Sequence, residues 1–196
     1  MKKSSIILIA IAAVLILAIF SGISTYNKLV TEREKVNSQW ANVESQYQRR
    51  SDLIPNLVAT VKGYATHESS TLEGVIAARA KATQVTVDAK TLTPEKLQQY
   101  QAAQGELTSA LGKLIMIKES YPELKANQNF LELQAQLEGT ENRISVERSR
   151  YNEVAQNYTT IIQRFPAVLF ANMFGFEKKP YFEAEKGTEK APSVKF

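Results

Sequence analysis

The chain has 196 residues, of which 44% are hydrophobic, and it carries a net charge of +4 without a single cysteine. The lack of cysteine excludes disulfides, thiolate metal ligands and a lipidated N-terminal cysteine. Lysine and arginine are spread among aspartate and glutamate along the sequence, so we expect no nucleic acid partner. A composition with eight glycines and six prolines, rich in Ala, Gln, Glu and Leu, favours helices.

The first segment is long and apolar enough to cross a membrane. Residues 6–23 carry no charge, and as a helix they reach ~27 Å, close to a hydrocarbon thickness of ~30 Å. Tyr26 follows where an interfacial aromatic residue is expected. We predict an N-terminal flank at 1–5 and an uncleaved signal-anchor helix at 6–25. Cleavage as a signal peptide near the small residues 22–24 is the alternative.

The orientation of this anchor depends on the charges at its two ends. Lys2 and Lys3 precede it, while Lys28, Arg33 and Lys35 follow it closely, so the count is nearly balanced. A short N-terminal flank usually stays in the cytoplasm. We therefore expect the remainder of the chain to lie outside the cytoplasm.

Beyond the anchor, apolar residues recur every three or four positions, which is typical of a helix with a near-heptad face. They run from Leu29 to Tyr47. Asp52 and Pro55 then resemble an N-cap and a proline in a first helical turn, so we predict a corner between two helices at this point. A kink within one continuous helix is the alternative.

The rest of the chain shows three further helical patterns. One runs from Ile54 to Arg79 and fades after Val87. The next begins at Thr93, a candidate cap, with Pro94 at the first helical position, and ends at 121–122, where a proline follows a tyrosine.

The last pattern is the most regular, from Phe130 to Phe165, and Pro166 interrupts it. We predict an all-α fold in which the transmembrane helix is followed by an antiparallel up-and-down four-helix bundle at 26–165. The tail at 166–196 begins apolar and ends charged. Its apolar part should pack on the bundle, touch the bilayer or bind a partner, the first being preferred.

Several motifs together resemble the LemA family of bacterial single-span membrane proteins. They are WANVESQYQRRSDLIPNLV at 40–58, VKGYATHE at 61–68, ARA at 78–80, YPELKANQNF at 121–130, ENRI at 141–144, YN at 151–152, FP at 165–166, FGF at 174–176 and PYFE at 180–183. The resemblance implies an anchored antiparallel bundle in a bacterial cell membrane. It implies no enzyme, cofactor or substrate.

Two groups of residues are candidates for an interaction site. Arg49, Arg50, Asp52 and Asn56 could form a polar recognition patch, although a surface ion pair with a helix cap is the preferred explanation. The second group comprises three phenylalanines of the apolar tail, Phe170, Phe174 and Phe176.

No catalytic, cofactor or metal residue is predicted. His67 is the only histidine, and Thr71 stands where a helical metal pair would need its second ligand. The preferred hypothesis is a scaffold or adaptor that binds another protein of the cell envelope. The alternative is a self-assembling structural protein, a homo-oligomer that organises or shapes membrane. An enzyme with an unrecognised site at His67 and Glu68 is the third hypothesis.

Overall fold

In this computed structural model, which describes residues 3–183, the chain is helical and that part of it contains no strand. The predicted all-α class is confirmed. The four main helices are α1 (Lys3–Tyr64), α2 (Ser69–Gln84), α3 (Pro94–Met116) and α5 (Gln128–Gln163). The connections between them contain the 3-10 turns η1 (Ala89–Thr91) and η2 (Ile117–Glu119) and the four-residue helix α4 (Pro122–Lys125). The short helix α6 (Ala167–Phe174) follows α5. Residues 1–2 of the predicted flank and the charged tail from 184 onward lie outside the described residues.

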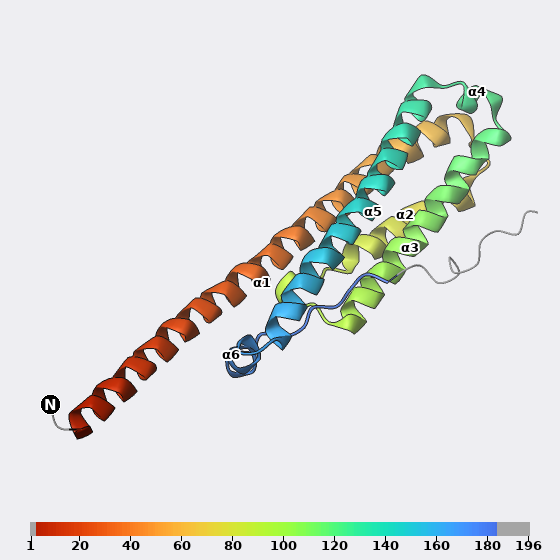
Figure 1. Cartoon of the computed structure of the whole chain (residues 1–196). Helices are drawn as coiled ribbons and strands as arrows, with labels where there is room; N and C mark the ends of the chain where they lie inside the picture. The colour runs from red at the N-terminus through yellow and green to blue at the C-terminus, as the bar shows by residue number, and fades with distance from the viewer. Residues whose placement is uncertain (1–2, 184–196) are drawn as a thin grey trace, which may run out of the picture.

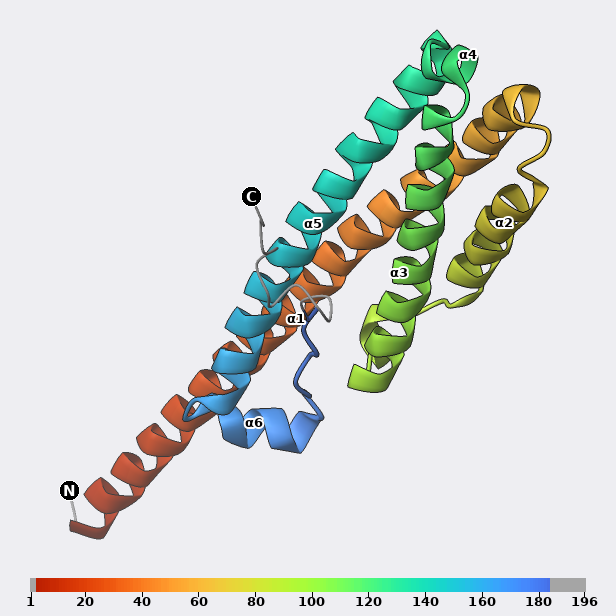
Figure 2. The same cartoon turned by 90° about the vertical axis from the view of Figure 1, so that its right-hand side faces the viewer.

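Helix α1 is far longer than its neighbours, and its N-terminal part projects alone from the bundle (Figure 1). Its C-terminal part packs along α5, which runs in the opposite direction, while α2 and α3 lie together beside them (Figures 1 and 2). Within residues 3–183, α1 is also the one helix long and apolar enough to cross a membrane, and none of its apolar window is buried.

The predicted corner at Asp52 and Pro55 is wrong, because α1 continues through both residues to Tyr64. Asp52 is an exposed residue within the helix and accepts a hydrogen bond from the Gln48 side chain at 2.7 Å instead of capping a new helix. Proline in a helix interior typically costs ~3 kcal/mol. Burial of Ile54 and Leu57 on either side of Pro55 offsets this cost.

The second predicted helix is also corrected, since residues 54–79 belong to two different helices. Helix α1 ends at Tyr64, and a tight turn follows in which the Glu68 amide donates to the Ala65 carbonyl at 3.2 Å. Ala65 is fully buried in this turn. The chain therefore reverses about ten residues later than the sequence suggested.

The remaining boundaries lie closer to the predicted ones. The Thr93 hydroxyl accepts from the Lys96 amide and caps α3, as expected. Helix α3 ends at Met116, before the predicted stop, and Pro122 occupies the first turn of α4. The cap of α5 is the side chain of Asn127, which accepts from the Phe130 amide at 2.9 Å.

Two hydrophobic clusters fill the bundle, one above the other. The cluster nearer the projecting part of α1 surrounds Trp40 and includes residues of the tail, and the distal cluster surrounds Leu57 and Phe130. Between them, Arg50 and Gln104 form a buried polar layer. Such a layer can fix how the helices align along their length.

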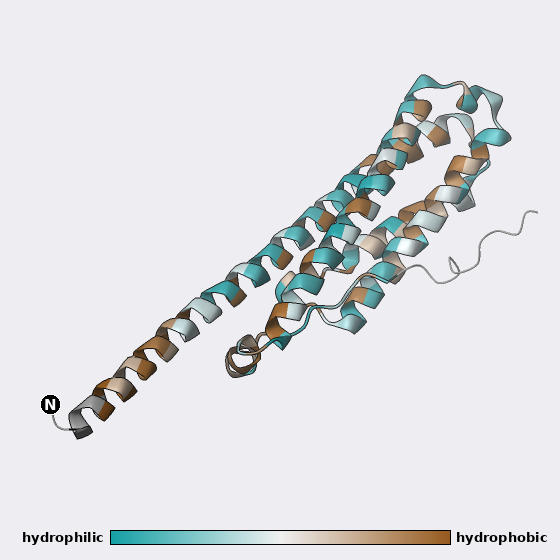
Figure 3. Ribbon diagram, viewed as in Figure 1, coloured by the Kyte–Doolittle hydropathy of each residue, from teal (hydrophilic) through white to brown (hydrophobic). Residues whose placement is uncertain are grey.

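The apolar beginning of the tail packs against the bundle only in part. Ala167 and Ala171 of α6 are buried, and so are Phe176 and Phe182 beyond it. Figure 3 shows that the hydrophobic colour is concentrated on the projecting part of α1 and on α6. Both lie at the same end of the molecule.

Candidate interaction site

Arg50 is not available for surface recognition, because its side chain is only 1% exposed. Its guanidinium donates to Glu141 and to the Gln104 side chain, and at 2.8 Å to the Thr108 hydroxyl. It also lies over the Tyr47 ring, 5.2 Å from the centroid. Arg50 thus joins α1 to α3 and α5, which is a structural role.

Arg49, Asp52 and Asn56 do share an exposed face of α1, since they are three and four residues apart. Within residues 3–183 no hydrogen bond or ion pair joins these side chains to another helix. The Asp52 carboxylate accepts from Gln48, and the Asn56 carbonyl accepts from Thr60, both within α1. The structure therefore separates this face from Arg50.

The three tail phenylalanines gather around the end of the apolar segment of α1. Phe170 approaches Gly22 so closely that a Cβ added there would lie 3.0 Å from its ring. The rings of Phe174 and Phe176 pack edge-on against Tyr26, with centroid distances of 5.0 and 5.7 Å. Phe176 is buried, whereas half of the Phe174 side chain is exposed.

An aromatic pocket that sequence reasoning missed holds the second part of the tail. The Phe182 ring stacks on Trp40 with a centroid distance of 5.7 Å and an angle of 11°, and Tyr151 closes the pocket edge-on. The Trp40 indole N–H donates to the Val87 carbonyl at 3.2 Å. The motif PYFE at 180–183 marks this segment in the sequence. Trp40 is about 140 residues away, so no local pattern predicts that Phe182 packs on it.

Side chains of α3 and α5 hold the backbone of this same segment. Asn152 makes two hydrogen bonds with Phe182, donating to its carbonyl at 2.9 Å and accepting from its amide at 2.8 Å. Arg148 and Gln101 both donate to the carbonyl of Glu183. The tail is therefore bound like an extended peptide, with its backbone recognised by an amide side chain.

Between residues 175–179 of the tail, α1 and the start of α3 lies a cleft of about 640 Å³. Three separate parts of the chain contribute basic side chains to its walls, and these outnumber the two acidic ones: the basic residues are Arg33, Lys90, Lys96, Lys178 and Lys179, and the acidic ones are Glu34 and Glu177. We call this cavity the basic cleft. Its charges are scattered in the sequence and come together only on folding.

Two polar groups in the walls of the basic cleft are unusual. Lys179 is buried, and its ammonium donates to the Ala89 carbonyl at 2.6 Å. Burial lowers the pKa of Lys179, and the nearby Arg33 acts in the same direction. The buried Asn37 Oδ1 has no hydrogen-bond partner among the described residues.

His67 lies in the turn after α1, and the neighbouring Glu68 accepts a hydrogen bond from the Tyr121 hydroxyl at 3.2 Å. This contact raises the pKa of Tyr121, after the larger effect of desolvation. Among residues 3–183 no group of three His, Asp or Glu side chains is placed to hold a metal ion.

A helical bundle carried on a long exposed apolar helix defines a class, that of membrane-associated helical proteins. The chain belongs to the LemA family, whose family model matches residues 39–196. Two relatives from Paramagnetospirillum magneticum, magnetosome proteins MamQ 1 and MamQ 2, are each 27% identical over 94% of this chain and 75% of their own length. Protein LemA of Metamycoplasma hominis is 24% identical over 71% of this chain and 60% of its own.

The likeness to the MamQ proteins covers more of the chain than the family match does. An alignment over 94% of the chain cannot fit within residues 39–196, so it includes part of the apolar N-terminal segment. The names of these relatives assign no enzymatic activity.

Proposed function

We propose that the protein is a single-pass membrane scaffold whose bundle lies outside the cytoplasm and binds an acidic segment of another envelope protein. The observation that carries the proposal is the basic cleft, in which five basic side chains face two acidic ones. Complementary charge guides such a partner and selects against basic ones. The apolar segment of α1, whose membrane-length window contains no buried residue, supports the anchor.

An extended acidic peptide suits the cleft for two reasons. Its carboxylates can pair with exposed ammonium groups such as those of Lys90 and Lys96. The chain already binds one extended segment, its own tail, through Phe182 and Asn152 in the adjoining pocket.

Binding is tested in cells with a photo-reactive amino acid at Thr91, a wall residue of the cleft, in the full chain. We expect a discrete crosslinked protein with an acidic segment. Reversing two charges with K90E and K96E should remove the adduct. The matched control is K62E with K113E, which reverses two exposed lysines that do not line the cleft and should leave the adduct intact. An adduct that survives K90E and K96E would refute the cleft as the binding site.

The orientation is tested separately. Because the chain has no cysteine, a single M116C substitution at an exposed position of α3 gives one reactive thiol. A membrane-impermeant maleimide should label this thiol in intact cells or spheroplasts. Labelling only after lysis would place the bundle in the cytoplasm and refute the proposed orientation.

A further inference from the structure

Helix α6 exposes large apolar side chains that the bundle does not cover. Its sequence, AVLFANMF, has a single polar residue, Asn172. Ala167 and Ala171 face the bundle, whereas Leu169 and Met173 point away from it and are 55% and 71% exposed. Phe165, one turn before Leu169, is 80% exposed. This face is therefore apolar and is left uncovered by the other residues of 3–183.

The position of α6 is fixed against the last turns of the apolar segment of α1. Phe170 packs on Gly22, and Phe174 packs on Tyr26. Between the two helices lies an open groove of about 560 Å³, lined by apolar side chains that include Leu15, Ile19 and Phe170. The exposed face of α6 is thus continuous with the exposed surface of α1.

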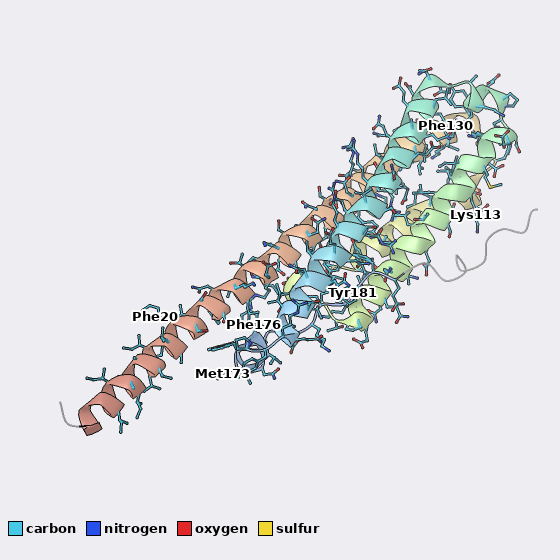
Figure 4. All side chains as sticks on the ribbon, in the orientation of Figure 1. Phe20, Lys113, Phe130, Met173, Phe176 and Tyr181 are labelled. Atoms are coloured by element: carbon cyan, nitrogen blue, oxygen red, sulfur yellow. The ribbon has the colours of Figure 1, made fainter. Side chains whose placement is uncertain are left out.

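The two helices meet in a way that suits a membrane boundary. Helix α6 runs across the axis of α1 instead of along it (Figure 2). In Figure 4, Phe20 projects from the isolated part of α1 and Met173 lies on α6 at the same end, while Lys113 and Phe130 mark the opposite end. If α1 crosses the bilayer, α6 lies at the level of the membrane surface and is inclined to α1.

The ends of α6 fit the same position. Arg164 precedes the helix and Lys178 follows it, both exposed, so that positive charges flank the apolar face. Such flanks suit lipid phosphates at the level where an amphipathic helix is half immersed. Tyr26, at the contact between the helices, is an aromatic residue of the type enriched at membrane interfaces.

We infer that α6 is an interfacial membrane helix, with Phe165, Leu169, Met173 and Phe174 in contact with lipid acyl chains. The inference rests on the proposed single-pass anchor. We assign lipid as the occupant because the apolar face of α6 lies at the same level as the lipid-facing surface of α1 and is continuous with it. The groove between the two helices is open and is lined by apolar side chains from both. The bundle is then held to the membrane at two places, α1 and α6.

The residues before and after α6 connect it rigidly to the bundle. Gly175 adopts the left-handed conformation, with φ of 69°, and ends the helix. The chain then turns so that Phe176 is buried against Tyr26 and under the Arg33 guanidinium. Because α6 is held at this end and continues from α5 at the other, its immersion fixes the tilt of the bundle and the height of the basic cleft above the membrane.

The test uses the full chain in vesicles of phosphatidylcholine with a minority of phosphatidylglycerol. Single-cysteine variants of the cysteine-free chain carry an environment-sensitive fluorophore at M173C, F20C or M116C. Met116 is the matched control, because it is 72% exposed, almost the same as Met173, but lies at the far end of α3. Lipids with a nitroxide near the headgroup or near the chain end quench the fluorophore according to depth.

We expect quenching at M173C to be several-fold stronger than at M116C and strongest with the shallow nitroxide. Quenching at F20C should be strongest with the deep nitroxide. If F20C is quenched while M173C behaves like M116C, the inference is overturned and the anchor stands. If F20C is not quenched, the proposed anchor fails, and the inference fails with it.

A second experiment asks whether the apolar character of α6 drives its immersion. A fluorophore at F165C reports the depth of α6, and M173E places a charge on the same face. We expect M173E to reduce quenching at F165C several-fold and M116E to leave it unchanged. Equal quenching with both substitutions would show that lipid does not contact the Met173 face, and would overturn the inference.

Discussion

The Arg79 side chain of α2 donates from Nε to the backbone carbonyl of Ser51 in α1, at 2.9 Å. Ser51 is four residues before Pro55, and proline has no N–H with which to bond this carbonyl. Arg79 therefore supplies the donor that the helix lacks, and it also bonds the Ser51 hydroxyl at 3.1 Å. Pro55 in α1 removes a backbone donor, and Arg79 in α2 replaces it. This contact helps α1 to continue as one helix through Pro55.

This relationship predicts a coupling between Arg79 and Pro55. The R79A substitution leaves the buried Ser51 carbonyl without its donor, which should lower the free energy of unfolding by about 1–3 kcal/mol. In a P55A background the new alanine N–H can bond Ser51, so R79A should cost less there. Urea unfolding of the four proteins of this double-mutant cycle measures the coupling.

The control for this cycle is K81A on the same helix. Lys81 pairs with Glu106 at 2.6 Å, but both side chains are more than half exposed, so its removal should cost less than about 1 kcal/mol in either background. An equal cost of R79A with and without Pro55 would contradict the proposed role of Arg79.

Part of this fold could be predicted, because helix periodicity is a local signal. The N-terminal cap of α3 at Thr93 and the apolar spacing of α5 are predicted correctly. The error at Pro55 arose because the proline was given more weight than the spacing: Tyr47, Arg50, Ile54, Leu57 and Val61 keep alternating steps of three and four through it. An unbroken phase of this kind indicates one helix, although the donor from Arg79 could not be foreseen.

The candidate site was less predictable, since its contacts join residues far apart in the sequence. Phe182 meets Trp40, and the basic cleft combines α1, the approach to α3 and the tail. Arg50 illustrates a different difficulty. It occupies a seam position of α1, but an arginine beside Arg49 and Asp52 suggests a surface patch unless its partners on α3 and α5 are known.

Arg50 should be essential for stability, unlike its neighbour. The R50A substitution removes the donor to the partly exposed Glu141 carboxylate, leaves the buried Gln104 oxygen without a donor and opens a cavity, which should cost about 2–5 kcal/mol. R50K should recover only part of this, because one ammonium cannot reach both groups as the guanidinium does. R49A, at an exposed position, should change stability by less than about 0.5 kcal/mol in thermal or urea unfolding. Similar losses for R49A and R50A would contradict this assignment.

We expect the tail to shield Trp40 from solvent. Trp40 is the only tryptophan of the chain, so its fluorescence reports on this pocket alone. F182A removes the stacked ring and should shift Trp40 emission to longer wavelength, with faster proteolysis of the tail. N152A removes the two backbone bonds of Phe182 and should act in the same direction. Tyr181, the exposed neighbour, provides the control: Y181A should leave the emission unchanged. An emission spectrum unaffected by F182A would show that the tail does not cover Trp40 in solution.

Two core tyrosines should make the bundle sensitive to alkali. Burial raises the pKa of Tyr100 and Tyr151 well above the ordinary value of 10.0, with smaller contributions from Tyr47 near Tyr100 and from Tyr181 near Tyr151. In the folded state both therefore keep their protons at a pH where the unfolded chain has lost them. Their contribution to stability is complete below pH 10 and is lost above it, at about 1.4 kcal/mol per pH unit for each group.

Substitution of one of these residues tests the cause. The Tyr151 hydroxyl has no hydrogen-bond partner within residues 3–183, so Y151F removes a titrating group without breaking a hydrogen bond. We expect Y151F to raise the midpoint of alkaline unfolding, measured by far-ultraviolet circular dichroism alongside tyrosinate absorbance, and to leave neutral stability unchanged or improved. Y64F, at a partly exposed position, also removes the hydrogen bond that the Tyr64 hydroxyl accepts from Asn127 at 2.8 Å, so it should not raise the alkaline midpoint. If every tyrosine of the native protein titrated near pH 10 with the helices intact, the burial of Tyr100 and Tyr151 would not control the alkaline transition.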